Sequence, residues 1–269
     1  MVDSTQRIRV GIGGWTFEPW RDNFFPAGLP HTQELHFASR AVTAIEVNGT
    51  YYSTQSPKSF ARWRDETPDD FVFSLKANRF ATNRRVLAEA GDSIQRFVES
   101  GLSELGQKLG PLVWQFAPTK QFDPVDFGAF LELLPKAVDG LALRHVLDVR
   151  HASFMVPAYL ALARRYGCAT VFADSDKFPS FADVTGDFVY ARLMQSQPDC
   201  ATGYEAETLA RWADVARDWA RGATPAGAPL VEPAHDSGAA RDVFVYFING
   251  AKERAPAAAQ ALIARLRTG

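Results

Sequence analysis

The chain has 269 residues, of which 46% are hydrophobic, and its 29 Lys and Arg against 31 Asp and Glu give a formal net charge of -2. The length is close to the roughly 250 residues of one α/β barrel. The near-neutral charge excludes a global field that would draw the protein to nucleic acid or to an anionic membrane. Neither Cys168 nor Cys200 stands in the paired spacing of a zinc or redox motif, so we expect both to be inert.

The amino-terminal stretch MVDSTQRIRVGIGG lacks the charged-then-apolar order of a signal segment, and no apolar run reaches the roughly 18 residues of a membrane span. We therefore expect a soluble, cytoplasmic protein with no membrane partner. The sequence indicates no oligomeric state.

Short apolar runs alternate with helical patterns from one end of the chain to the other, which is typical of βα units in a parallel sheet. Strand patterns occupy residues 8–12, 43–47, 71–76, 111–115, 145–149, 169–173, 188–193 and 242–247. Helical patterns occupy residues 32–40, 57–66, 92–109, 125–134, 156–166, 205–221 and 256–266. Eight strands with helices between them predict an α/β fold, a single TIM-like (β/α)8 barrel domain spanning residues 1–269.

Three connections refine this prediction. The first turn, GIGGW, lacks the GxGxxG spacing of a dinucleotide site. The connection after the sixth strand is short and contains proline, so we expect no more than a stub of helix there. Residues 223–238 are rich in Pro, Ala and Gly without periodicity and predict a surface loop before the last strand.

Polar side chains stand at the carboxyl end of nearly every expected strand, where a barrel places its active site. Because alternate strand residues share a face, we expect them to point into one pocket. The candidates are Trp15, Glu46, Asn48, Tyr51, Lys76, Gln115, Asp148, Arg150, His151, Asp174, Tyr190, Arg192 and Asn249. The alternative is that these charges only pair with one another and plug the barrel, which is an inefficient way to stabilise a fold because buried ions lose their hydration.

Seven motifs occur in a fixed order along the chain: GIGGWTFEPWRDNFFP, AIEVNGTYY, WRDETPDDFVFSLKANRFAT, LGPLVWQFAP, DVRHASF, YARL and VYFIN. From about residue 8 to residue 262 this series resembles the YecE-like family, known as domain of unknown function 72. The resemblance implies a TIM-barrel-like fold and no established reaction.

The chain departs from that family's pattern at three places. Asp148 stands where relatives usually carry Glu, and Met194-Gln195 stands where they carry His-Gly. Of the polar group in the last motif only Asn249 remains. Whether a function of close relatives transfers to this chain is therefore open.

The leading hypothesis is an enzyme of the hydrolase or lyase type that acts on a small polar, anionic or sugar-like substrate by carboxylate acid/base chemistry. Glu46, in the apolar run AIEV, is the first choice for the base or acid, with a structural pair between Glu46 and Lys76 as the alternative. Lys76 and Arg192 would hold charge, since both suit oxyanions. Asp148 with Arg150, and Asp174, would orient the site.

Sugar chemistry is favoured by aromatic rings that can stack on a sugar, at Trp15, Trp20, Tyr51 and Tyr190. The large group of barrel glycosidases, however, would require carboxylates on the fourth and seventh strands. This chain has Gln115 and Arg192 there.

Three further alternatives stay open. We expect no cofactor, but Glu46, Asp148, Asp174 and His151 are the conceivable ligands of a divalent metal, and such a set favours Mg or Mn over Zn. The segment NRFATNRR, with its aromatic ring among basic residues, would suit single-stranded nucleic acid, in a barrel related in architecture to barrel endonucleases. The third alternative is a non-catalytic barrel that binds a small ligand.

Overall fold

The protein is described by a computed structural model over residues 7–234 and 236–268. Eight strands close into a barrel in the order β1-β10-β9-β8-β7-β4-β3-β2, and every neighbouring pair is parallel. The predicted TIM-like barrel is confirmed. The barrel strands are β1 (Ile8–Gly13), β2 (Ala44–Val47), β3 (Val72–Lys76), β4 (Leu109–Gln115), β7 (His145–Asp148), β8 (Ala169–Asp174), β9 (Phe188–Leu193) and β10 (Asp242–Phe247).

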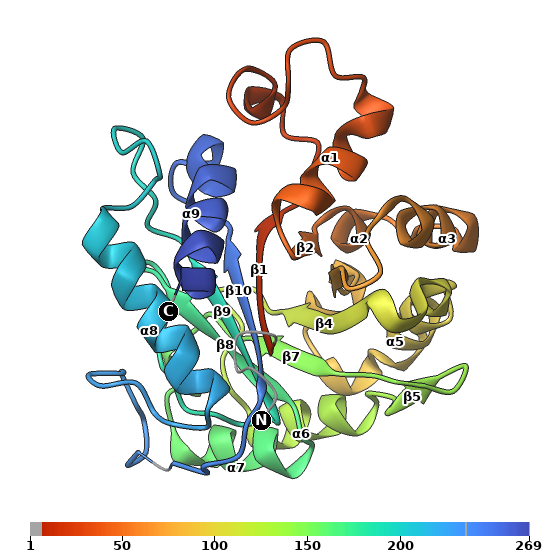
Figure 1. The fold of residues 1–269 in the computed structure, drawn as a ribbon. Coiled ribbons are helices and arrows are strands. Elements are labelled where there is room, and N and C mark those ends of the chain that lie inside the picture. The colour runs from red at the N-terminus through yellow and green to blue at the C-terminus, as the bar shows by residue number, and fades with distance from the viewer. Residues whose placement is uncertain (1–6, 235, 269) are drawn as a thin grey trace.

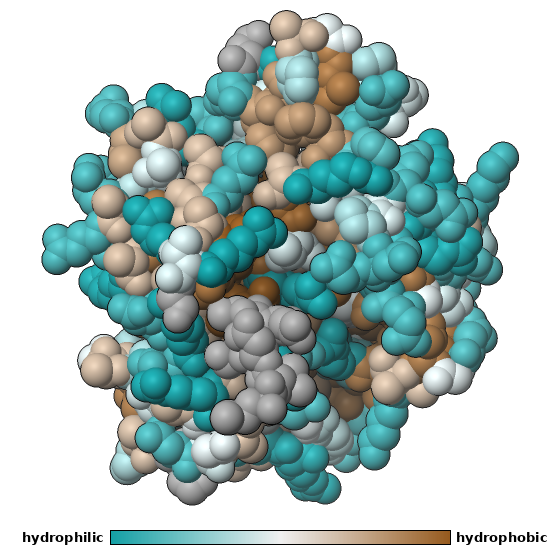
Figure 2. Space-filling model, viewed as in Figure 1, coloured by the Kyte–Doolittle hydropathy of each residue, from teal (hydrophilic) through white to brown (hydrophobic). Residues whose placement is uncertain are grey.

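Helices surround the strands on all sides, as Figure 1 shows. The α-helices are α1 (Glu34–Ala41), α2 (Gly49–Tyr52), α3 (Pro57–Glu66), α4 (Arg79–Thr82), α5 (Gly91–Val98), α6 (Pro124–Glu132), α7 (Pro157–Arg165), α8 (Ala206–Ala220) and α9 (Ala255–Thr268). Short 3-10 turns are η2 (Glu18–Asp22), η3 (His31–Gln33), η4 (Leu87–Glu89), η5 (Leu102–Lys108), η6 (Ala152–Phe154) and η7 (Lys252–Arg254). The outer surface in the same view is mostly hydrophilic, with separate hydrophobic patches at the top, near the centre and at the right (Figure 2).

Local sequence explains where several helices begin. The Asp123 carboxylate accepts hydrogen bonds from the backbone N–H groups of Val125 and Asp126, at 2.8 and 3.1 Å, and so caps α6. Ser56 caps α3 in the same way through the N–H of Ser59. Proline follows each of these caps, where its missing N–H costs no helical hydrogen bond.

Strand alternation divides the buried side chains into two clusters. One lies between the strands and the helices and includes Val10, Phe73, Trp114 and Phe172. The other fills the barrel interior and comprises Ala44, Val72, Val113, Val146, Ala169, Val171, Phe188, Tyr190, Phe244 and Tyr246. The residues at the carboxyl ends of the same interior faces are therefore forced into the mouth of the barrel.

Gly11 makes room in the interior layer. A Cβ at this position would lie 2.2 Å from the carbonyl oxygen of Ala44 and 2.8 Å from the ring of Tyr246.

At the amino end of the barrel, Arg144 lies over the rings of Phe188 and Phe244 and donates a 2.8 Å hydrogen bond to Asp242. This end is filled by an arginine that is already paired.

The predicted helix over residues 92–109 is wrong in its second half. The α-helix ends at Val98, and the chain continues as the 3-10 segment η5. Gly101 adopts a left-handed φ of 94°, and a Cβ there would lie 2.5 Å from the ring of Pro57. Gly106 also has a positive φ, of 56°. The periodic apolar pattern therefore crosses a backbone turn that a single helix cannot make.

Sequence reasoning missed a small hairpin, β5 (Ala137–Val138) with β6 (Leu141–Ala142), which lies at the periphery in Figure 1. Its turn is Asp139-Gly140, both with positive φ, and Asp-Gly between apolar residues is a strong hairpin signal. No helix occurs between β8 and β9, as the short connection predicted. No helix within residues 7–234 and 236–268 has the length and apolar character needed to cross a membrane.

The predicted loop over residues 223–238 has no helix or strand among its described residues. It is more firmly packed than a plain surface loop. The Asp183 carboxylate accepts hydrogen bonds from the backbone N–H groups of Val231 and Glu232, and Leu230 and Val231 pack against the outer core.

Candidate active site

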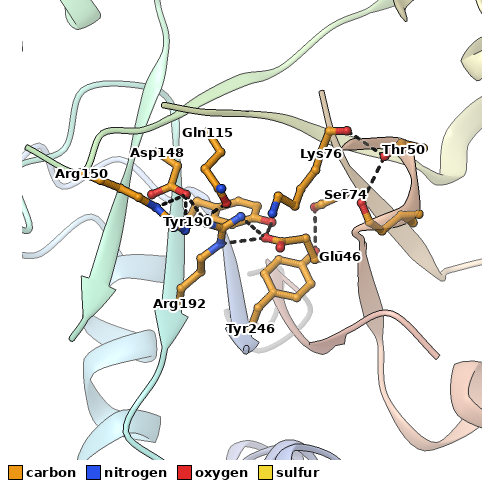
Figure 3. Close-up of polar contacts among 11 residues, drawn as sticks. Glu46, Thr50, Ser74, Lys76, Gln115, Asp148, Arg150, Tyr190, Arg192 and Tyr246 are labelled. Atoms are coloured by element: carbon orange, nitrogen blue, oxygen red, sulfur yellow. Dashed lines mark hydrogen bonds and ion pairs between the residues drawn. The ribbon is translucent and has the colours of Figure 1, made fainter. Parts of the chain in front are cut away.

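Arg192 forms the centre of a buried polar cluster in the mouth of the barrel (Figure 3). Its side chain, on β9, is 1% exposed and lies between two carboxylates. Nε and Nη2 stand 2.9 and 2.8 Å from Oε2 of Glu46, and Nη1 donates to Oδ2 of Asp148. Tyr190 donates a further hydrogen bond of 2.6 Å to Oε2 of Glu46. The cluster is thus held together from three strands.

These residues meet because every second side chain along a strand points to the same face. Tyr190 and Arg192 follow Phe188 on the inner face of β9, and Glu46 follows Ala44 on the inner face of β2. Asp148 lies two residues after Val146, which is also an interior residue. The layer of side chains directly above the apolar interior of the barrel is therefore charged.

Asp148 joins Arg192 to a second guanidinium. Arg150 donates from Nε to Oδ2 of Asp148 at 3.1 Å and from Nη2 to Oε1 of Gln115 at 3.0 Å. Burial alone would raise the pKa of the Asp148 carboxyl, but the charges of Arg192 and Arg150 hold this pKa below its ordinary value. The ring of Phe178, from the loop after β8, covers the Arg150 guanidinium at 4.4 Å.

Lys76 enters the cluster from the side opposite Arg150, as Figure 3 shows. The residue is 9% exposed, and its Nζ lies 4.6 Å from the centre of the Tyr51 ring. Within the described part of the chain, no carboxylate lies within 4.0 Å of this ammonium group. Burial, followed by the positive charge of Arg192, lowers the pKa of Lys76 from 10.5 to about 8.

The predicted alternative of a structural pair between Glu46 and Lys76 is wrong. The partners of Glu46 are Tyr190 and Arg192, and its Oε1 is buried without a hydrogen bond from any described residue. The reason is that Arg192 places two nitrogens against one carboxylate oxygen. The cluster contains five charged groups. Its three cations are Lys76, Arg150 and Arg192, and its two carboxylates are Glu46 and Asp148, so one positive charge is in excess.

Neighbouring contacts hold Lys76 and Tyr51 in place. Thr50 donates hydrogen bonds to the carbonyl oxygens of Lys76 and Val47, at 2.7 and 3.1 Å, which ties α2 to the ends of β2 and β3. Tyr51 is carried by the same short helix. Below, Ser74 and Tyr246 share a hydrogen bond of 2.7 Å. Strand alternation predicts that Ser74 shares the face of Lys76, but the sequence does not predict its hydrogen bond with Tyr246 across the barrel.

Three predicted site residues, Asp174, His151 and Asn249, lie apart from the cluster. Asp174 shares the outward face of β8 with Phe172, which packs against Trp212 and Trp219 of α8. Its carboxylate accepts a hydrogen bond from Gln195, and burial raises its pKa to about 6. His151 caps η6 by accepting from the N–H of Ser153.

Asn249 is exposed, and its carbonyl oxygen accepts a hydrogen bond from Ser196. The same serine binds the carbonyl oxygen of Ala251, so the loops after β9 and β10 are joined to each other. Trp15 and Asn48 line a pocket at the rim, beside the cluster.

The conceivable metal ligands do not form a set. Arg192 occupies the position between Glu46 and Asp148, Asp174 faces outward, and His151 caps a turn. Across residues 7–234 and 236–268, no three His, Cys, Asp or Glu side chains are grouped as metal ligands would be. The residues present therefore do not fit a divalent metal at this site.

Comparison with known proteins places the chain among relatives of the same fold. The model of the family described as "Protein of unknown function DUF72" matches residues 9–269. The chain is 28% identical over 150 residues to the UPF0759 protein YecE of Escherichia coli K12, covering 55% of this chain and 50% of that protein. The chain thus spans about half the length of the curated relatives it matches first.

Two solved structures have the same fold as this chain over nearly its whole length. A DUF72 family protein of Thermotoga maritima has a TM-score of 0.72 at 20% identity, over 97% of this chain and 99% of that one. A DUF72 family protein of Enterococcus faecalis has a TM-score of 0.71 at 16% identity, over 97% and 96%. At these identities the similarity establishes the fold.

Proposed function

Since this chain belongs to the DUF72 family of proteins of unknown function, we propose from the chemistry of its barrel mouth that it is an enzyme of the hydrolase or lyase type acting on a small anionic substrate. The observation that carries the proposal is the burial of Lys76 without an ion-pair partner among the described residues. This cation is almost fully buried at the end of a strand, in a cluster with an excess positive charge and with no carboxylate in ion-pair contact among the described residues. A buried, unpaired cation destabilises a fold, which favours a functional reason for keeping it.

Lys76 is the proton-transferring group of the proposal. With its pKa near 8, an appreciable fraction of this amine is neutral at slightly alkaline pH and can accept a proton from the substrate or from a water molecule. The ammonium form can return the proton to the leaving group. Once an anionic substrate binds beside it, the added negative charge raises the pKa of Lys76, which favours proton uptake.

Arg150 and Gln115 supply substrate binding. Both are partly exposed at the mouth, and the guanidinium offers a planar fork to a carboxylate or phosphate. Asp148 fixes the orientation of Arg150. Phe178, stacked on the other side of this guanidinium, limits the directions from which an anion can approach.

Glu46 is assigned a positioning role. Its residue is 0% exposed and Oε2 is occupied by Tyr190 and Arg192, so it holds Arg192 beside Lys76 and does not itself contact substrate. Arg192, in turn, contributes to the lowered pKa of Lys76.

The test is a turnover screen with matched lysine variants. Wild-type protein is incubated with a panel of sugar acids, sugar phosphates, lactones and hydroxy acids, and products are followed by NMR. For any substrate found, Lys76→Met is expected to reduce kcat by about 10²–10⁴-fold, the usual contribution of a general acid or base. Lys58→Met removes an exposed lysine of α3 and is expected to leave kcat unchanged. Full turnover by Lys76→Met would contradict the assignment.

A second candidate function, single-stranded nucleic-acid binding, is favoured by one surface feature. The exposed rings of Tyr52 and Phe80 flank Arg79, whose guanidinium carbon lies 5.8 and 5.6 Å from their centres. Exposed aromatic rings beside arginine are a stacking platform for bases. Salt-sensitive binding of an oligonucleotide, lost in Phe80→Ala, would support this function, and no binding at physiological ionic strength would exclude it.

A further inference from the structure

A pocket of about 250 Å³, the rim pocket, lies at the edge of the barrel mouth. It is formed where the ends of β1 and β2 meet the turn after β10. Its volume lies just below the roughly 300–1,000 Å³ of drug-sized small-molecule sites, so it has room for about one ring with a substituent. Its principal lining residues are Gly13, Trp15, Asn48, Gly49, Gln55 and Lys252.

The rim pocket adjoins the charged cluster through the backbone. Gly13 is the register partner of Glu46, and the N–H of Gly14 donates to the carbonyl oxygen of Glu46 at 2.9 Å. Asn48 follows Glu46 by two residues. A ligand in this pocket therefore lies beside the strand that carries Glu46.

Glycine residues keep the pocket open. Gly14 has a φ of 78°, and a Cβ built on Gly14 or Gly49 would meet no atom within 4 Å. A Cβ on Gly13 would approach the Asn48 side-chain nitrogen to 3.1 Å. Glycine is typical of places where a ligand approaches the backbone closely. The GIGGW motif, which has no dinucleotide spacing, thereby acquires a specific role.

The walls combine aromatic and amide groups. Trp15 is half-buried and held edge-on against Trp63, with ring centres 5.1 Å apart and an angle of 81°. Asn48 and Gln55 supply side-chain amides to the same pocket. Aromatic surface beside hydrogen-bonding amides is suited to a sugar ring, which presents C–H groups and hydroxyls on different sides.

Lys252 adds a positive charge to the rim pocket. Its Nζ lies 4.4 Å from the centre of the Phe17 ring, and its carbonyl oxygen accepts a hydrogen bond from Nε1 of Trp20 at 2.9 Å. Among the residues the structure describes, no carboxylate is within ion-pair distance of this half-buried ammonium group. Burial lowers the pKa of Lys252 below its ordinary value. An anionic group would supply the missing counter-charge.

We infer that the rim pocket binds a sugar ring whose anionic substituent, a carboxylate or a phosphate, is held by Lys252. The inference narrows the substrate class and rests on the proposed function: the ring and one anionic substituent would occupy the rim pocket, and the reacting group of the same molecule would extend to Lys76 and Arg150 at the centre of the mouth. The neutral amides orient the ring, and the ammonium group selects for charge.

The test measures binding by calorimetry with four probes: glucuronate, glucose 6-phosphate, glucose and inorganic phosphate. We expect one of the two charged sugars to bind at least about tenfold more tightly than glucose or phosphate, a difference of about 1.4 kcal/mol. Which charged sugar binds better identifies the anion. Equal or absent binding of all four probes would overturn the inference.

Two variants locate the bound sugar. Lys252→Met removes the charge and Gly49→Val places a side chain in the empty space above Gly49, and both are expected to weaken binding at least about tenfold. Gly49→Ala is the milder version, with a smaller loss, should Gly49→Val fold poorly. Lys58→Met is the matched control and is expected to bind as wild type does. Unchanged binding in both Lys252→Met and a Gly49 variant would overturn the rim site.

Lys76→Met separates this inference from the proposed function. Because Lys76 does not line the rim pocket, we expect this variant to retain sugar binding while losing turnover. Binding lost in Lys76→Met but kept in Lys252→Met would place the anion at the centre of the mouth and overturn the rim site alone. Turnover kept in Lys76→Met would overturn the proposed function alone.

Discussion

Replacing Lys76 with methionine should make the protein more stable at neutral pH. The ammonium group is almost fully buried, and burial is the largest cause of its lowered pKa. Methionine has a similar length and no charge to desolvate. A lysine kept at a cost in stability is typical of a functional site, where activity and stability are often opposed.

The magnitude follows from the pKa. A fall from 10.5 to about 8 corresponds to about 3 kcal/mol, at about 1.4 kcal/mol for each pKa unit. Below pH 8 the lysine is protonated in both the folded and the unfolded chain, so the whole penalty is present. Between about pH 8 and 10.5 the unfolded chain binds the proton that the folded chain has released, so stability rises with pH. The penalty is absent above that window.

Urea unfolding at pH 7 and pH 9.5 tests this expectation. At pH 7 the free energy of unfolding of Lys76→Met should exceed that of wild type by up to about 3 kcal/mol, and at pH 9.5 by less than about half of that. Lys58→Met, which removes an exposed lysine, should match wild type at both values. A Lys76→Met protein that is less stable than wild type at pH 7, or a difference that does not change with pH, would show that the buried ammonium group does not destabilise the fold.

Other substitutions test the cluster and the fold. Arg192→Met leaves the buried Glu46 carboxylate without its cation and should lower the free energy of unfolding by about 3–5 kcal/mol, while adding Glu46→Gln should recover at least about 1 kcal/mol of that in a double-mutant cycle. Gly11→Ala should cost at least about 2 kcal/mol, seen as a lower Tm, because its Cβ would overlap the carbonyl oxygen of Ala44. Asp123→Ala should cost about 1 kcal/mol in urea unfolding through loss of the α6 cap.

The barrel could be predicted from the sequence because strand and helix periods are local signals. The eight apolar segments all form barrel strands, and the polar residue at the inner carboxyl end of each of several strands lies in the mouth. What the periods do not contain is backbone conformation at single residues. The positive φ of Gly101 interrupts a segment whose apolar pattern looks helical. Asp139-Gly140 forms the turn of a hairpin whose two strands have only two residues each.

The sequence predicted which charged residues meet in the barrel mouth, and it predicted their pairing less well. Asp174 was expected in the pocket because it ends a strand, but it shares the parity of Phe172 and so faces the helices. Counting alternation from Val171 would have placed it correctly. The choice of Arg192 over Lys76 as the partner of Glu46 depends on distances across the barrel, which sequence spacing does not contain.

The rim pocket illustrates the same limit. Lys252 lies far from Trp15 in the sequence, and only barrel closure brings β10 beside β1. The glycines of GIGGW were visible in the sequence, but their purpose depends on the empty space beside them.

The proposed reaction requires Lys76 to be a buried amine that can transfer a proton near neutral pH. NMR titration of isotope-labelled lysine side chains measures this directly, because the chain contains only seven lysines and Lys76→Met identifies the signal. We predict a titration midpoint of about 8 for Lys76. A midpoint near the ordinary value of 10.5 would show that Lys76 is not a proton-transferring group at neutral pH.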